Sequence, residues 1–228
     1  MKTYRKRPLF LFFLCICCFI FLTFFCLLYG RVLQELQNQT LIIDRGFAYI
    51  TLQHESDPTQ LPQTQESLDG FDELFARLTE NQQKYTYYEI YRQPLFMDGD
   101  QHESIQISNN VISDFSLEIN IGRGFRQEDF SSEKENPIPI ILGSDLKDSY
   151  SLNDEFWAQY LYEDYLFKVI GFLSPGSQIQ RSTGTINLDS YYVMPSVEFT
   201  YRPTTETQYI SQIIHRANKT SGKIRVSP

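Results

Sequence analysis

The hydrophobic positions divide the chain into one long apolar run and a following segment of short amphipathic stretches. The run covers residues 8–29, contains no charged residue and has Thr23 as its one mildly polar position. A helix of that length is about 33 Å long, enough to cross a bilayer core of about 30 Å. The run therefore predicts a transmembrane helix, with residues 30–45 as a short stalk.

Basic residues at the start of the chain predict the orientation of this helix. Residues 1–7 contain Lys2, Arg5, Lys6 and Arg7, and the positive-inside rule places such a cluster in the cytoplasm. The chain is then a single-pass protein of the cell membrane with an extracytoplasmic domain. A cleaved signal peptide is the alternative. Its apolar core would be about 7–15 residues long and would precede an Ala-x-Ala-like site, so the longer run here favours an uncleaved anchor.

Beyond the stalk, period-two alternation and β-prone residues predict a series of short strands. The Asp98-Gly99 turn predicts a hairpin that pairs the aromatic stretch 85–91 with the alternating stretch 104–108. A second turn is expected at Glu163-Asp164. The predicted strands span residues 47–52, 85–91, 104–108, 117–121, 137–142, 156–162, 165–173 and, as the last one, 191–194.

Three helices are predicted among these strands. The best one begins at Ser67 as N-cap and places five apolar side chains on one face: Leu68, Phe71, Leu74, Phe75 and Leu78. Shorter helices are expected at 144–150 and 209–217. Interleaved strands and helices predict an α+β fold, with residues 46–228 forming a mixed α/β extracytoplasmic domain of one or two lobes.

Charge and cysteine content narrow the range of partners. Beyond the cytoplasmic segment, 16 Lys and Arg face 28 Asp and Glu, a net charge of −12. Such a surface repels nucleic acid and anionic lipid, and it is either a solvated exterior or a surface for a cationic partner. All cysteines lie in the apolar run, at positions 15, 17, 18 and 26. The exterior part therefore has no disulfide and no thiolate metal site, which favours a bacterial surface protein.

Candidate chemistry is sparse in this sequence. His54, His102 and His215 lack ligand spacing and are interpreted as surface histidines. The acidic stretch 98–103 fits a hairpin turn better than a cation site, and the tyrosines of 85–91 fit core packing better than a sugar-stacking platform. No nucleophile elbow or phosphate-binding loop is present, so no catalytic residue, metal or cofactor is predicted and the protein is not expected to be an enzyme. A pair of catalytic carboxylates has no local spacing rule, so an exterior enzyme acting on the cell wall remains a third hypothesis.

Three stretches between residues 114 and 173 have a characteristic order: DFSLEINIGRGFRQEDF, PIPIILGSDLKDSY and DYLFKVIGFL. They resemble the periplasmic core domain of MacB-like and FtsX-like ABC-transporter permeases. Residues 187–195 are similar to a later strand of that family. The matching residues are Gly122, Arg123, Phe125, Glu128, Asp129, Ile140, Leu142, Gly143, Leu146, Phe167, Val169, Ile170, Gly171 and Leu173.

The resemblance implies structural roles for these residues, chiefly Gly122, Arg123, Phe125, Asp129, Gly143, Phe167, Val169 and Gly171. Such permeases have four membrane helices, form dimers and work with a cytoplasmic ATPase that moves the exterior domains. The expectation is a partial or split permease, because the 228 residues contain one apolar run of membrane length. Its partners would be a separate ABC ATPase subunit, the remaining permease helices and a second copy of the chain. The alternative is a single-pass surface binding or sensing module without a transporter partner.

Overall fold

The computed structural model describes residues 21, 23, 48–52, 54, 57–80, 85–132, 137–181, 184–199 and 201–226. The chain divides into two units, Met1–Gly46 and Phe47–Pro228, and the elements below belong to the second. In the first unit, Phe21 and Thr23 are helical, and the rest of the predicted membrane helix and the stalk lie outside the described residues. No helix within the described ranges has both the length and the apolar character needed to cross a bilayer.

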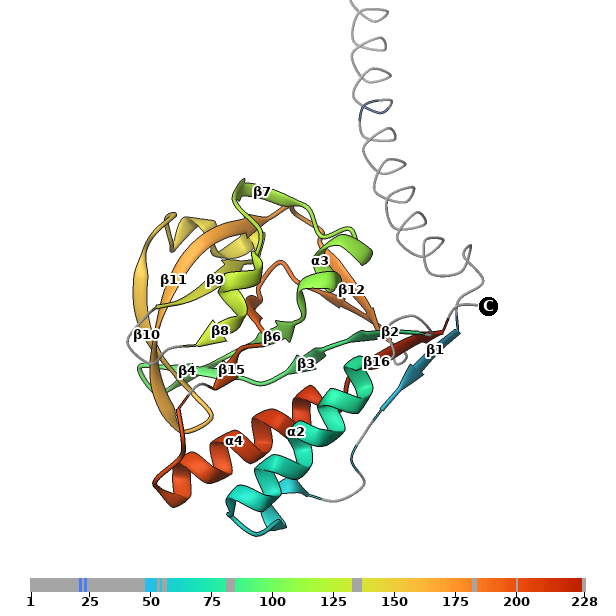
Figure 1. Cartoon of the computed structure of the whole chain (residues 1–228). Coiled ribbons are helices and arrows are strands. Elements are labelled where there is room, and N and C mark those ends of the chain that lie inside the picture. The colour runs from blue at the N-terminus through green and yellow to red at the C-terminus, as the bar shows by residue number, and fades with distance from the viewer. Residues whose placement is uncertain are drawn as a thin grey trace, which may run out of the picture. The chain divides into compact units, whose positions relative to one another are not determined.

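The second unit is an α+β domain built on a curled sheet (Figure 1). Two pairs of neighbours in the sheet, β9 with β11 and β6 with β14, are parallel, and the other pairs are antiparallel. A further strand, β7 (Ile119–Gly122), pairs with β11. In spatial order the remaining strands are β3 (Ile90–Arg92), β6 (Ser104–Ile107), β14 (Tyr192–Pro195), β9 (Ile138–Leu142), β11 (Glu163–Leu173), β10 (Glu155–Tyr160), β4 (Leu95–Met97) and β5 (Asp100–His102).

One hairpin brings the two ends of this sheet together. Strands β3 and β4 stand near opposite ends of the spatial order, yet only Gln93 and Pro94 separate them in the chain. Proline has no amide hydrogen for a ladder, so the chain can leave one edge there and join the other. The hairpin register is continuous from Ile90 opposite Ile107 to Met97 opposite Asp100. The predicted hairpin is confirmed for β3 and β6 but not for residues 85–88, which pair with another strand. The hairpin curls the sheet into a barrel-like shape.

The curled sheet is buried on its inner side and on part of its outer side. The inner cluster includes Tyr160, Phe167 and Met194. A second cluster covers β6, β14 and β9 from outside and includes Val111, Ile141 and Val193. Strand β6 is consequently buried at every position, although its sequence alternates.

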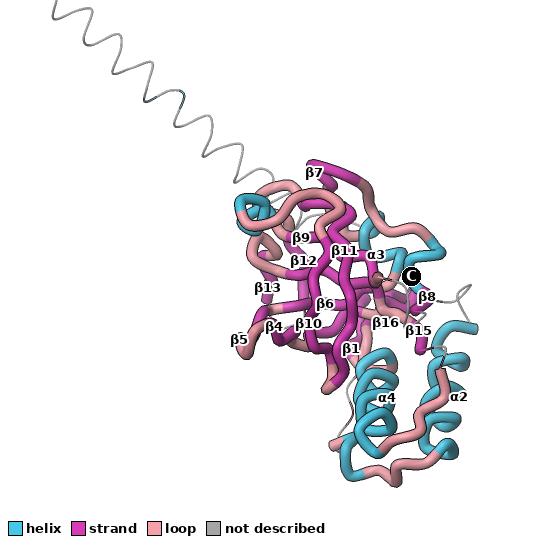
Figure 2. Tube along the Cα trace, turned by 90° about the vertical axis from the view of Figure 1, so that its left-hand side faces the viewer, coloured by secondary structure: helices cyan, strands magenta, loops and turns pink. Residues whose placement is uncertain are grey.

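Two helices lie side by side next to the sheet, α2 (Gln65–Glu80) and α4 (Glu206–Lys219) (Figures 1 and 2). A three-stranded antiparallel sheet, β1 (Ala48–Thr51), β16 (Lys223–Val226) and β2 (Tyr85–Tyr88), joins the first and last strands of the unit. The shorter elements are η1 (Pro58–Gln60), α3 (Asn109–Asp114), η2 (Gln127–Phe130), η3 (Ser144–Asp148), the pair β12 (Gln178–Arg181) and β13 (Gly184–Asn187), and the pair β8 (Ser131–Ser132) and β15 (Glu198–Phe199).

Several predicted boundaries are wrong. Helix α2 begins at Gln65 rather than after Ser67, because the Thr64 hydroxyl accepts a hydrogen bond from the Ser67 amide and takes the capping role. The turn between β10 and β11 is formed by Leu161 and Tyr162, both with positive φ, so residues 163 and 164 already belong to β11.

Two further differences concern the strands. The aromatic strand breaks at Glu89 into β2 and β3, and these strands enter different sheets. Strand β14 is not the last strand, since β15 and β16 follow it, and the pair β12–β13 was not predicted. Short polar strands of this kind lack the apolar alternation on which the prediction depends.

Candidate functional site

Helix α4 turns a stripe of polar side chains toward the sheet. Ser211, His215 and Lys219 are spaced by four residues, so they share one face of the helix, and all three are buried. The neighbouring face packs on α2 through a cluster of Leu68, Phe71, Ile213 and Ala217. A helix of this length is normally held by an apolar stripe, so a buried polar stripe marks α4 as more than a packing element.

His215 is held in a single protonation state by this environment. Its Nε2 lies 2.6 Å from the carbonyl oxygen of Val197, and its Nδ1 lies 2.7 Å from the Tyr160 hydroxyl. A carbonyl can only accept, so Nε2 carries the proton and Nδ1 accepts from Tyr160. Burial, followed by the positive charge of Lys219, lowers the pKa of His215 well below its ordinary value. The ring is neutral at pH 7, and the prediction of a surface histidine is wrong at this position.

A second polar group, Glu89, enters the site from the break between β2 and β3. The Ser196 hydroxyl donates to its carboxylate, and Lys219 Nζ lies 3.6 Å from it. Burial raises the pKa of Glu89, and the charge of Lys219 acts in the opposite direction. Because the aromatic strand breaks at Glu89, this carboxylate lies where the chain passes from one sheet to the other.

Lys219 stands between two carboxylates and an aromatic ring. Its Nζ lies 3.6 Å from Glu198 as well as from Glu89, and 4.5 Å from the centre of the Phe75 ring. Both ion-pair separations exceed the usual length of a direct N–H···O hydrogen bond, and the ring provides a cation–π contact. The ammonium group is therefore stabilised chiefly by charge.

The polar network continues into the sheet. Gln106 Oε1 accepts from the Tyr91 hydroxyl at 2.7 Å and lies 3.1 Å from the Tyr160 hydroxyl oxygen, whose single hydrogen is donated to His215. Among the described residues, Gln106 Nε2 and Ser211 Oγ have no hydrogen-bond partner. An unsatisfied buried polar group costs about 1–3 kcal/mol, so the network is not optimised for stability alone.

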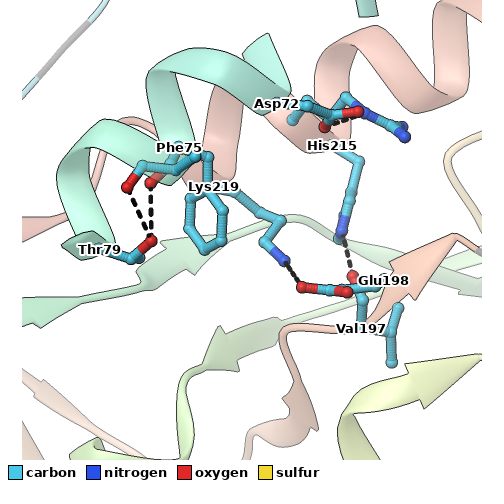
Figure 3. Close-up of a pocket in the computed structure, with 9 residues that line it drawn as sticks. Asp72, Phe75, Thr79, Val197, Glu198, His215 and Lys219 are labelled. Atoms are coloured by element: carbon cyan, nitrogen blue, oxygen red, sulfur yellow. Dashed lines mark hydrogen bonds and ion pairs between the residues drawn. The ribbon is translucent and has the colours of Figure 1, made fainter. Parts of the chain in front are cut away.

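Lys219 separates two cavities. The first has a volume of about 390 Å³ and lies between α2, α4 and the segment that carries Val197 and Glu198 (Figure 3). The second is a more open groove of about 580 Å³ on the other side of Thr79, Glu198 and Lys219, which line both. The groove is lined mainly by neutral amides and hydroxyls, together with aromatic rings: Ser108, Asn109, Asn110, Ser113, Gln127, Phe125 and Phe130.

This arrangement suits binding better than acid–base catalysis. Both ring nitrogens of His215 are occupied by Tyr160 and Val197, and the ring is buried, so it cannot exchange a proton with a bound molecule. Glu198 is largely exposed at the edge of both cavities, and Lys219 reaches them from α4. A ligand with a hydrogen-bond acceptor for Lys219 and polar groups for the amides would fit the groove.

The other two histidines and the acidic turn lie elsewhere. His54 is exposed and its Nε2 lies 2.8 Å from the Thr220 hydroxyl, while His102 lies on the β5 strand with its ring edge against Tyr192. Asp98 and Gly99 have positive φ and form the two-residue turn of the β4–β5 hairpin, as predicted. Tyr87, Tyr88 and Tyr91 are buried, which confirms core packing for these three tyrosines, whereas Tyr85 is half-buried.

The residues that carry the family resemblance lie away from Lys219, with Phe125 in the groove lining as the one exception among them. Gly122 stands opposite Gly171 across β7 and β11, and a Cβ atom at Gly171 would lie 2.6 Å from the Arg123 carbonyl oxygen. Arg123 binds Asp129 through two hydrogen bonds, at 2.5 and 3.1 Å. The others are packed inside: Phe125 against Phe130, Gly143 against the backbone of Leu188 and Asp189, and Phe167 and Val169 in the inner core.

The residues of the Lys219 site were not identified from the sequence. The spacing of Ser211, His215 and Lys219 was visible, but the predicted helix stopped at residue 217 and His215 was interpreted as a surface histidine. Glu89 and Ser196 come from segments more than a hundred residues apart, and no local pattern brings them together.

Comparisons with known proteins give limited similarity. No protein-family model matches the sequence, and no curated protein matches it. Among solved structures, the periplasmic region of MacB from Actinobacillus actinomycetemcomitans is 13% identical, with 79% of this chain and 73% of that chain covered and a TM-score of 0.40. The extracellular domain of the noncanonic ABC-type transporter YknZ from Gram-positive bacteria is 13% identical over 78% of this chain and 80% of that one, with a TM-score of 0.35.

Proposed function

We propose that this chain is the membrane-anchored extracytoplasmic domain of an ABC-transporter permease-like protein, partial or split. It couples a cytoplasmic ATPase to export or to other work outside the membrane. Its partners are the ATPase subunit, the remaining permease helices and a second copy of the chain. The basic cluster before residues 8–29 supports this placement of the domain.

The observation that carries this proposal is the way the resembling stretches assemble. They are separated in the sequence, yet they form the neighbouring strands β14, β9, β11 and β7. Gly122 and Gly171, from two different stretches, meet across β7 and β11 with no space for a side chain between them. Residues that depend on one another in this way form a single structural unit, which is what a shared domain architecture requires.

The three-stranded sheet suggests how movement would enter the domain. Strand β1 is the first described strand of the unit, and it pairs with β16 along four residues from Ala48 to Thr51. Strand β16 in turn pairs with β2, so the chain entering from the stalk is held by a continuous antiparallel ladder. Under the proposal, a displacement of the membrane helix acts on the domain at β1, which this ladder joins to β16 and β2.

A second candidate function is a single-pass binding or sensing module without a transporter partner. The cavity and the groove on either side of Lys219 favour this alternative, because they offer a ligand a buried charge and neutral polar groups. Such a module would need no ATPase.

Affinity purification of the tagged full chain from membranes of its native host separates the two. We expect a P-loop protein and vanadate-sensitive ATP hydrolysis to co-purify with the chain. In the matched control, an unrelated membrane helix replaces residues 8–29, which keeps the domain outside and should abolish the association. Recovery of the chain without any P-loop protein would reject the transporter role and leave the binding module.

A further inference from the structure

The outer side of β4, β10 and β11 carries an exposed apolar surface, here called the Trp157 face and defined by Phe96, Trp157 and Leu166. Trp157 is the only tryptophan of the chain and is 65% exposed, and Phe96 is 39% exposed. Trp157 stands opposite Leu166 on β11, and Phe96 stands opposite Gln159 on β10. Because directly opposed residues share a side of the sheet, these three side chains lie on one surface.

This surface contrasts with the rest of the sheet's outer side. The second hydrophobic cluster covers β6, β14 and β9, and all four residues of β6 and of β14 are buried. Single exposed apolar residues are common on proteins, but neighbouring large ones on an uncovered sheet face mark an interaction site. The exposed apolar surface is therefore local to the Trp157 face, because β6, β14 and β9 of the same sheet are covered.

The two hairpins that build this face are strongly acidic. Residues 95–103 and 154–168 contain one basic residue, Lys168, which is paired with Glu155 at 3.1 Å. Among the described residues, neither Asp98, Asp100 nor Asp164 forms a salt bridge. Of the seven carboxylates in these two segments, Glu155 and Asp164 stand on the same side of the sheet as Trp157, Glu103 stands on the same side as Phe96, and Asp98 lies in the β4–β5 turn.

We propose that the Trp157 face docks a basic polypeptide segment of a partner protein, with an apolar side chain of that segment covering Trp157. Buried aromatic anchors commonly dominate binding energy, and complementary charges around them direct the encounter and exclude wrong partners. The acidic surroundings repel nucleic acid and anionic lipid. They also oppose a symmetric contact with a second copy, which would bring the same carboxylates together. This inference stands on the face alone and is independent of the proposed transporter role.

The single tryptophan makes the face directly measurable. The full chain, purified in an uncharged detergent, is titrated with a short synthetic peptide of lysine, leucine and glycine while Trp157 emission is recorded. We expect a blue shift that saturates and weakens with added salt, because the indole is covered and the attraction is screened. A peptide with glutamate in place of lysine should bind at least about tenfold more weakly.

Two matched triple variants test the location. Asp98→Asn, Glu155→Gln and Asp164→Asn together should weaken the binding about tenfold, and asparagine is well tolerated at the positive φ of position 98. The control removes the same charge from exposed positions of α2 through Glu66→Gln, Asp69→Asn and Glu80→Gln, and should leave the affinity unchanged. Equal losses of affinity in both variants would show that the effect comes from net charge alone, and this would overturn the proposal.

A labelled version of the lysine peptide tests the aromatic anchor by fluorescence anisotropy. Trp157→Ala should abolish most of the binding, and Leu74→Ala, which removes an exposed apolar side chain on α2, should not. The proposal fails if Trp157→Ala binds like the unmodified chain. It also fails if Trp157 emission shifts with protein concentration in the absence of peptide, which would identify a second copy as the occupant.

Discussion

At the scale of single residues, two kinds of position determine the behaviour of this domain. Glycines at β7 and β11 allow two strands to approach with no space for a side chain, and Gly122 additionally has a φ of +82°. Buried polar residues, above all His215 and Glu89, hold α4 against the sheet through hydrogen bonds and charge. Both kinds of position respond to conservative changes in ways that can be measured.

Gly171→Val should destabilise the domain by about 2–3 kcal/mol, because its Cβ would lie 2.6 Å from the Arg123 carbonyl oxygen and that backbone cannot move freely. Thermal unfolding should show a melting temperature about 5–10 °C lower. Gly70→Ala is the matched control. Nothing lies within 4 Å of a Cβ at this helical position, so alanine should stabilise α2 by about 0.5–1 kcal/mol. If the valine variant has the same melting temperature as the wild type, there is no close contact at this position of β11.

His215 should make the folded domain acid-sensitive. The unfolded chain binds a proton at this residue below about pH 6.5, whereas burial keeps the folded ring neutral, so stability falls as the pH decreases from that value. The contribution is at most about 1.4 kcal/mol per pH unit. Urea unfolding at pH 7.5 and 5.5 should show a smaller difference for His215→Gln than for the wild type. His54→Gln, which leaves His215 intact, should retain the wild-type difference.

At the scale of elements, the apolar face that the sequence predicts is not always buried along its whole length in the structure. Helix α2 has an apolar stripe, but only its Leu68 and Phe71 are buried, and Leu74 on the same predicted stripe is 39% exposed. Strand β11 agrees with its pattern, since Tyr165, Phe167 and Val169 are all buried in the inner core. The difference arises because α2 lies at the edge of the unit and packs on α4 mainly through its first turns.

Leu68 and Leu74 of α2 therefore should not be equivalent. Leu68→Ala should cost about 2–5 kcal/mol, because it leaves a cavity between α2 and α4, whereas Leu74→Ala should change the free energy of unfolding by less than about 1 kcal/mol. Chemical denaturation of both variants measures this contrast. Equal losses would mean that α2 buries its whole stripe.

At the scale of the whole molecule, the second unit is an α+β domain whose sheet is curled by one hairpin. The acidic exterior, with a net charge of −12, and the basic cluster before the apolar run place opposite charges at the two ends of the predicted topology. The Lys219 cavities and the Trp157 face are separate sites on the same domain: the first lies beside α2 and α4, and the second on the outer side of β4, β10 and β11.

The predicted topology can be tested on intact cells. Protease added outside should remove residues 31–228, while a tag placed before Lys2 should stay protected, since the basic cluster retains the N-terminus in the cytoplasm. Permeabilised cells serve as the control and should lose the tag as well. A domain that resists protease until permeabilisation would reverse the orientation.

The sequence by itself determined the local elements: the hairpin at Asp98-Gly99, the alternation of β11, the buried β9 and the existence of α2 and α4. These follow from the period of apolar residues and from turn chemistry, which act between near neighbours. Only the tertiary structure decided that β3 and β4 join opposite parts of one sheet, and that Glu89, Ser196, His215 and Lys219 meet. The structure also left Trp157 uncovered. The physical reason is that periodicity specifies which face of an element is apolar, whereas the partner of that face is set by long-range packing, which a local pattern does not encode.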